Sequence, residues 1–382
     1  MSHIKDQFLL DPDIVFLNHG SFGATPKPVF DAYQGWQREL ERQPVEFLDR
    51  RFAERMATSR AVLADYLGTQ RDNLVYVTNA TVGLNIIARS LNLSPGDEVL
   101  STNHEYGACD RAWRFLSQKR GFVYISQPIS MLLASVEDFL EQLWRGVTAR
   151  TKVIYLSHIT SPTAVIFPIA EVCRRAREQG ILTVIDGAHA PGQIHLDLEE
   201  IGADFYTGNL HKWLCAPKGA GFLYARPEVQ NLLEPLIVSW GWESEKSGSS
   251  QFIDHHEWWG TRDIAAFLSV TAAIKFQREH NWGVVRAACH ALTVAAETQI
   301  RELTGLPSQY SDDTWYTQMV AALLPSETDI LILKKYLYEE HRIEVPLIEW
   351  NEYKLIRVSV QGYNTVSDID TLIMALRKCF SG

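Results

Sequence analysis

The feature that most constrains the fold is a series of short apolar runs separated by segments of helical length. The runs are rich in Val, Ile and Leu, and they are continuous rather than alternating. We predict strands at 74–77, 98–101, 122–125, 152–156, 181–185, 203–206 and 221–225. Continuous apolar strands are buried on both faces, which is typical of a mostly parallel sheet covered by helices. The sequence therefore predicts an α/β fold around a mostly parallel seven-stranded sheet.

The length of the chain favours a second, smaller unit beside this sheet. With 382 residues, 46% of them hydrophobic, the chain can bury one large core and one smaller core. We predict a large α/β domain over 16–264. A smaller C-terminal α+β domain is expected over 265–382, joined by the N-terminal arm 1–15. Its expected elements are helices over 264–279 and 284–303 and strands over 343–347 and 355–360.

Composition excludes several classes of protein. The net charge is -10 and the chain has no basic cluster, which argues against nucleic acids and anionic membranes as partners. No apolar run is as long as a membrane span, and the N-terminus lacks a secretory segment. The five cysteines form no CxxC pair, which argues against a disulfide framework or a zinc site. We expect a soluble cytoplasmic protein without a metal site.

Polar side chains gather directly after the predicted strands. They include His104, Ser161, Asp186, His189 and Lys212. Open α/β sheets bind their ligands at the carboxyl ends of the strands. This edge of the sheet is therefore the expected ligand site.

A candidate phosphate site follows the first predicted strand. The polar stretch 78–83, which includes Thr81, precedes a helix and would place free N–H groups and hydroxyls at its N-terminus. An ordinary capped helix has the same pattern, so the stretch alone does not distinguish the two. Because the chain has no GxGxxG and no GxxxxGK[ST], the sequence disfavours a dinucleotide or a nucleoside triphosphate.

Lys212 and Asp186 point to a particular cofactor. Lys212 lies between two apolar runs; it could be an ordinary strand-end lysine, but a buried lysine has a lowered pKa and can form a Schiff base. Asp186 ends an apolar strand, where a buried carboxylate needs a cationic partner such as a protonated heteroaromatic nitrogen. Together with a phosphate site near Thr81, these residues describe pyridoxal 5'-phosphate (PLP).

Stretches throughout the chain resemble the class V aminotransferase family of fold-type I PLP-dependent enzymes. Within this family the chain looks most like the isopenicillin N epimerase group. The matching stretches are 16–23 (FLNHGSFG), 79–81 (NAT), 103–106 (NHEY), 157–163 (SHITSPT), 186–189 (DGAH), 208–219 (GNLHKWLCAPKG), 356–359 (IRVS) and 363–365 (YNT). The resemblance covers essentially the whole chain.

The resemblance implies which residues hold the cofactor. Lys212 would form the Schiff base, Asp186 would pair with the ring nitrogen, and His104 would stack on the ring, with Tyr106 as the alternative. The implied phosphate ligands are Ala80, Thr81, Asn209 and His211. The predicted neighbours of the phenolic oxygen are His189 and Ser161. Thr261 resembles a residue that the family lends to the neighbouring subunit's phosphate, which implies a homodimer with active sites at the subunit interface.

The resemblance also implies a small amino-acid-like substrate. Arg357 resembles the family's clamp for the substrate carboxylate, which an arginine binds bidentately. Asn18 and His19 would line the same substrate mouth. A surface arginine paired with an acid is the ordinary alternative for Arg357.

The reaction class stays open among three outcomes once Lys212 has removed the proton from Cα. Reprotonation from the opposite face gives an epimerase, loss of a Cβ sulfur gives a lyase, and protonation of the cofactor gives an aminotransferase. Epimerisation needs a second acid, for which His104, Tyr106 or a residue near His19 could serve. The stretch 344–350 lacks the reactive cysteine of sulfur-relay desulfurases. We predict an epimerase like those of the isopenicillin N group, with a Cβ–S lyase or a class V aminotransferase as alternatives.

Overall fold

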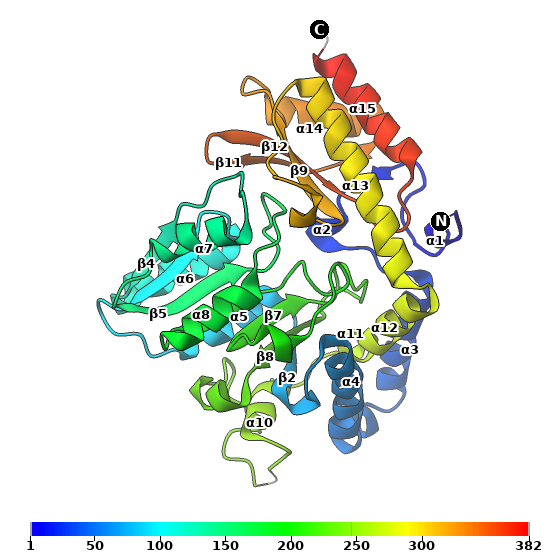
Figure 1. The fold of residues 1–382 in the computed structure, drawn as a ribbon. Helices are drawn as coiled ribbons and strands as arrows, with labels where there is room; N and C mark the ends of the chain where they lie inside the picture. The colour runs from blue at the N-terminus through cyan, green and yellow to red at the C-terminus, as the bar shows by residue number, and fades with distance from the viewer. Residues whose placement is uncertain (1, 246, 381–382) are drawn as a thin grey trace.

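The computed structural model describes residues 2–245 and 247–380, and a seven-stranded sheet forms its centre (Figure 1). The strand order is β2-β8-β7-β6-β5-β3-β4. The strands β3 to β7 are mutually parallel, whereas β8 runs antiparallel to both β7 and β2. The bounds are β2 Leu74–Val77, β3 Glu98–Thr102, β4 Val123–Gln127, β5 Thr151–Ser157, β6 Leu182–Asp186, β7 Phe205–Asn209 and β8 Gly221–Ala225. The predicted mostly parallel sheet is confirmed.

Both faces of this sheet are buried, as the continuous apolar runs predict, except at the edge strand β4. In β6, Val184 and Ile185 belong to two different apolar clusters, one on each face. One cluster includes side chains of α5 (Ala80–Ser90) and α6 (Gly107–Arg120). The other includes side chains of α7 (Val136–Trp144) and α8 (Ile169–Glu178). The sheet is therefore the middle layer of an α/β/α arrangement.

Helix α5 lies directly against the sheet. Its N-cap is Asn79, whose side chain accepts a hydrogen bond from the Val82 N–H at 3.0 Å. A Cβ added to Gly83 would come within 2.1 Å of Thr207 Oγ1 in β7. Only glycine allows this approach, so Gly83 fixes the start of α5 close to the end of β7.

A second sheet lies in the C-terminal part of the chain. It is antiparallel, with the order β11-β12-β9, and its strands are β9 Met319–Leu324, β11 Leu347–Trp350 and β12 Tyr353–Ser359. Beside it lie α13 (Trp282–Thr304), α14 (Ile330–His341) and α15 (Val366–Phe380), as Figure 1 shows. Near the N-terminus, β1 (Val15–Phe16) pairs in parallel with β10 (Ile343–Glu344). The N-terminal segment thus joins this part of the chain.

The remaining helices are short or lie outside the two sheets. They are α1 Ser2–Lys5, α2 His19–Phe22, α3 Lys27–Arg42, η1 Glu46–Arg50, α4 Phe52–Leu67, η2 Arg71–Asn73, α9 Leu198–Ile201, η3 Pro227–Leu232, α10 Gln251–Glu257, α11 Ala265–Leu268, α12 Val270–Glu279 and η4 Asp313–Trp315. None of the described helices is long and apolar enough to cross a membrane. Helices α11 and α12 follow the proposed domain boundary at residue 264, and they pack against α3 and α4, which precede it. The boundary itself stays a prediction.

Two predicted elements are interrupted. The helix expected over 264–279 is two helices that meet at Ser269, whose hydroxyl donates to the Ala265 carbonyl at 2.7 Å. The strand expected over 343–347 is divided between β10 and β11. Pro346 lies between them and has no N–H to continue a ladder.

Candidate active site

A cavity of about 470 Å³ opens at the carboxyl ends of the central strands. It collects side chains that follow five different strands of the large sheet. Its lining residues are Ser21, Phe22, Asn79, Ala80, Thr81, Val82, Tyr106, Ser157, Ile159, Ser161, Asp186, Ala188, His189, Asn209, His211 and Lys212. Eight of the predicted site residues are among them: Ala80, Thr81, Ser161, Asp186, His189, Asn209, His211 and Lys212.

Asp186 is a buried carboxylate that has no cationic hydrogen-bond partner among the described residues. Its Oδ1 accepts the Ala188 N–H at 2.8 Å, and its Oδ2 accepts the Cys109 thiol at 3.4 Å. Burial raises the pKa of this carboxyl above its ordinary value. A protonated ring nitrogen would supply the missing positive charge, so this end of the cavity fits PLP.

Lys212 follows β7 and lies on the cavity wall. Its Nζ is 3.1 Å from His189 Nε2. Part of its surface faces the cavity, yet the surrounding protein desolvates the amine. This desolvation, followed by repulsion from Arg357, lowers the pKa of Lys212 to about 7. A lysine with this pKa is largely unprotonated at slightly alkaline pH, which is the form that attacks an aldehyde.

The N-terminus of α5 forms the anion-binding end of the cavity. The Ala80 N–H donates to Asn209 Oδ1 at 2.8 Å, so this predicted phosphate donor is already engaged. Thr81, with its first-turn N–H and its hydroxyl, remains on the cavity wall. His211 Nδ1 donates to the Ala220 carbonyl at 3.1 Å, and burial lowers the pKa of this histidine to about 4. A bound phosphate dianion would favour protonation of His211 at Nε2.

Arg357 in β12 is not among the lining residues; it lies directly behind the cavity wall and binds two residues of that wall, Ser21 and Ser161. Its Nη1 donates to the carbonyl and hydroxyl oxygens of Ser161 at 2.6 and 3.1 Å, and its Nη2 donates to Ser21 Oγ at 3.2 Å. Only 4% of Arg357 is exposed, and burial lowers its pKa to about 10. All of these acceptors are neutral. A buried guanidinium of this kind is suited to bind a carboxylate.

His104 does not lie on the cavity, contrary to the prediction that it stacks on the cofactor. Its Nδ1 is 2.7 Å from Thr163 Oγ1, and its Nε2–H donates to the Ile129 carbonyl at 3.1 Å. The centroid of its ring is 4.4 Å from that of Trp350. Tyr106, two residues further, lines the cavity and is 45% exposed. The tight turn after β3 turns His104 into the protein and brings Tyr106 to the ligand side.

The predicted substrate residues Asn18 and His19 also lie behind the cavity wall. Asn18 donates to Glu344 Oε1 at 2.9 Å. His19 is fully buried, with Nδ1 2.9 Å from the Tyr363 hydroxyl and Nε2 3.0 Å from the Lys212 carbonyl. Sequence reasoning missed Ser21, which lines the cavity and binds Arg357. The sequence signal that could have indicated Ser21 is its position as a hydroxyl residue between Gly20 and Gly23.

Thr261 is not on the cavity of its own chain. It lies in the exposed connection between α10 and α11. Its predicted contact with the neighbouring subunit's phosphate therefore stays a prediction.

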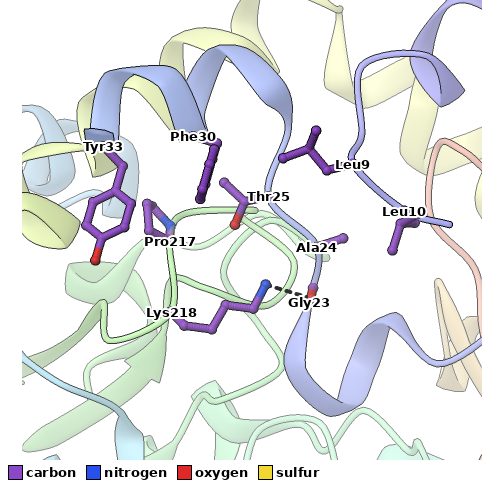
Figure 2. A pocket seen from close by; sticks show the side chains of 9 residues that line it. All are labelled: Leu9, Leu10, Gly23, Ala24, Thr25, Phe30, Tyr33, Pro217 and Lys218. Carbon is purple, nitrogen blue, oxygen red and sulfur yellow. Dashed lines mark hydrogen bonds between the residues drawn. The ribbon is translucent and has the colours of Figure 1, made fainter. Parts of the chain in front are cut away.

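A second cavity, of about 340 Å³, lies beside the N-terminal segment (Figure 2). Lys218 extends along it and donates to the Gly23 carbonyl at 2.9 Å. The rest of the lining is mainly apolar, with Leu9, Leu10 and Phe30 among the side chains. None of the predicted site residues is among those described around it.

Comparisons with known proteins agree with the geometry of the larger cavity. The chain is 33% identical to isopenicillin N epimerase of Amycolatopsis lactamdurans, covering 99% of this chain and 98% of the relative. It is 27% identical to a probable chloroplastic L-cysteine desulfhydrase of Arabidopsis thaliana, covering 97% and 84%. A solved structure of a C-DES variant with glycine covalently linked to its PLP cofactor has the same fold. Its TM-score is 0.85 at 20% identity, and the match covers 98% of each chain.

A family model agrees with these matches over nearly the full length. The model described as "Aminotransferase class-V" matches residues 15–372. The residues of the larger cavity fit the cofactor of this family, with an amine, a carboxylate and a helix N-terminus around one space. The chain therefore belongs to the class V aminotransferase family and is a PLP-dependent enzyme.

Proposed function

We propose that this enzyme epimerises the Cα centre of an amino acid or an amino-acid-derived substrate. One observation carries the proposal: Lys212 and Tyr106 line the same cavity. Lys212 follows β7 and Tyr106 follows β3, and these strands lie on opposite sides of β6, which carries Asp186. A flat ring held by Asp186 would thus have one proton-transferring group from each side.

The residues around the cavity would divide the binding of the cofactor among them. PLP, when bound, supplies the electron sink that makes the Cα–H of an attached amino acid acidic. Asp186 would hold the proton on the ring nitrogen, and His189 would donate to the phenolic oxygen. Thr81 and the other groups near the start of α5 would hold the phosphate.

The substrate would be oriented by Arg357 and deprotonated by Lys212. The guanidinium would bind the substrate carboxylate bidentately, which fixes Cα above the ring. The amine of Lys212 would accept the Cα proton on its own side. The Tyr106 hydroxyl would donate a proton from the other side, and this delivery inverts the configuration.

The relatives support two reaction classes to different degrees. The isopenicillin N epimerase relative shares 33% identity, and the desulfhydrase relative shares 27%. A direct Cβ–S lyase is therefore the second candidate. A persulfide relay has less support, because no cysteine is among the described residues that line the cavity.

A product analysis in deuterated water tests the proposal. The PLP-loaded enzyme is incubated with single enantiomers of amino acids and of peptides with a free α-amino acid end. We expect the opposite enantiomer to form with deuterium at Cα, and we expect Lys212→Ala to abolish both. Pyruvate and sulfide from cysteine or cystine would instead identify a lyase. A 2-oxo acid with the amine form of the cofactor would identify an aminotransferase.

We also propose a cytoplasmic homodimer in which Thr261 completes the partner's phosphate site. Two inactive variants, Lys212→Ala and Thr261→Glu, test this when they are co-expressed. If the two residues serve one site from different subunits, the mixed dimer contains one site with both substitutions and one intact site. Activity should then reappear. Two variants that stay inactive together while forming mixed dimers would contradict the shared site.

A further inference from the structure

Trp213, the residue after Lys212, contacts the histidine that faces the lysine amine. Its indole Nε1–H donates to His189 Nδ1 at 3.2 Å, while His189 Nε2 lies 3.1 Å from Lys212 Nζ. We infer that Trp213 is a positioning residue: it fixes the tautomer of His189 and thereby keeps the Lys212 amine unprotonated and ready for a carbonyl. That the unprotonated amine reacts with a carbonyl rests on the proposed function.

The direction of the first hydrogen bond decides the tautomer. An indole N–H can only donate, so His189 Nδ1 must offer its lone pair. In a neutral imidazole the single proton then lies on Nε2. His189 is neutral, because burial first of all, and then the charge of Arg357, lower its pKa well below the ordinary value. Its Nε2–H therefore points at Lys212 Nζ.

The second hydrogen bond follows from the first. Because Nε2 carries the proton, Lys212 Nζ must accept, and only an unprotonated amine has a lone pair for this. The opposite tautomer would present a lone pair to Nζ and stabilise the ammonium form. The indole N–H thus favours the neutral lysine. The same Nε2–H is the donor that the predicted contact with the phenolic oxygen of PLP requires.

The orientation of Trp213 is fixed by its surroundings. A Cβ on Gly192, in the loop that carries His189, would lie 2.3 Å from the Trp213 carbonyl carbon, so the two backbones touch. Gly192 has a φ of +90°, which also favours glycine. The Trp213 carbonyl accepts from Gln277 Nε2 at 2.9 Å, and the indole is fully buried beside Met319. The indole N–H has no freedom to turn away.

Other charged or titratable groups also act on this pair. The pKa of Lys212 is also affected by Arg357, Asp186 and Cys109. The pKa of His189 is affected by Arg357, His211 and His19 as well as by Lys212. All of them remain in a Trp213→Phe variant, which removes the indole N–H and keeps an aromatic ring. A difference between this variant and the wild type therefore isolates the hydrogen bond. Trp282→Phe is the matched control, because Trp282 is 5% exposed and its Nε1 has no partner among the described residues.

Two measurements on the full-length enzyme stripped of PLP test the inference. Nitrogen-15 NMR of histidine-labelled protein, assigned with His189→Gln, should show His189 protonated at Nε2 in the wild type. The pH dependence of Lys212 modification by dinitrofluorobenzene, followed by peptide mass spectrometry, gives the midpoint of its amine. We expect this midpoint to rise by about one pH unit or more in Trp213→Phe. It should stay unchanged in Trp282→Phe.

Three results would overturn the inference. They are an Nδ1-protonated His189 in the wild type, an unchanged midpoint in Trp213→Phe, and an equal rise in both tryptophan variants. If Trp213→Phe does not fold, the wild-type NMR spectrum still decides. Both measurements are made without cofactor or substrate, so a different reaction of the loaded enzyme would contradict the proposed function and leave this inference standing.

Discussion

Glu105 Oε2 accepts two hydrogen bonds from Ser157, from the N–H at 2.8 Å and from the hydroxyl at 2.7 Å. Its Oε1 accepts the Thr102 hydroxyl at 2.7 Å. This carboxylate therefore joins the turn after β3 to the end of β5, at the wall of the active-site cavity. Tyr106 is the next residue in the chain, so its position depends on this link.

Glu105→Ala should therefore reduce both stability and activity. Buried donors on Ser157 and Thr102 would lose their acceptor, which should lower the free energy of unfolding by about 2–4 kcal/mol in urea titrations. Glu98→Ala is the matched control. Glu98 is also a buried carboxylate, held by Thr148 and Arg150 at the opposite end of β3. The control should lose stability and keep its kcat/KM; equal activity in the two variants would contradict the positioning role of Glu105.

The pKa of Lys212 should make the stability of the cofactor-free protein depend on pH. Its pKa is about 7 in the folded protein and 10.5 ordinarily, so between these values the unfolded chain binds the extra proton. Stability must then rise with pH across this window, by up to about 1.4 kcal/mol per pH unit from this group. Lys212→Met should remove this contribution. Urea titrations of both proteins from neutral to alkaline pH measure it, and parallel curves would contradict the lowered pKa.

Tyr106→Phe should separate the two proton transfers. The ring is kept and the hydroxyl is lost, so epimerisation should fall about 100-fold or more. Deuterium incorporation at Cα of the unreacted enantiomer should continue, because Lys212 still exchanges the proton on its own side. His104→Asn is the comparison variant and should affect thermal stability more than turnover. Full epimerisation by Tyr106→Phe would exclude the phenol as the second acid.

Arg357→Met should stabilise the free protein while weakening substrate binding. The wild-type guanidinium is buried with neutral acceptors, and its Nε has no partner among the described residues. An apolar side chain of similar length should raise the free energy of unfolding by about 1–2 kcal/mol. KM should rise at least about 10-fold. Arg357→Lys, which keeps the charge without the planar fork, should show the KM effect without the gain in stability.

The seven strands of the large sheet could be predicted from the sequence with every bound within three residues of the observed one. Apart from the edge strand β4, each is largely buried, and a polar residue at the end of a strand, such as Asp186, marks its boundary. The helix expected over 264–279 is interrupted at Ser269, and apolar spacing gives no sign of this break. Local patterns predict strands and helices well because the apolar residues that each element buries recur at the spacing of that element.

The candidate site was less predictable where one turn decides which side chain faces the ligand. The stretch 103–106 offers both His104 and Tyr106, and only the folded turn shows that Tyr106 lines the cavity. His19 is similar, because its partners Lys212 and Tyr363 are distant in sequence. The contact between Trp213 and His189 also joins two separate loops. Periodicity and motif spacing carry no information about such contacts.

The close packing of α5 on β7 at Gly83 has a consequence for how the cofactor enters. The anion-binding end of the cavity and the segment that leads to Lys212 are in direct contact, so neither can shift without the other. PLP should therefore meet a receptor whose shape already exists. The association of PLP should show a single kinetic phase and a small heat-capacity change, as expected for binding to a preformed, rigid site.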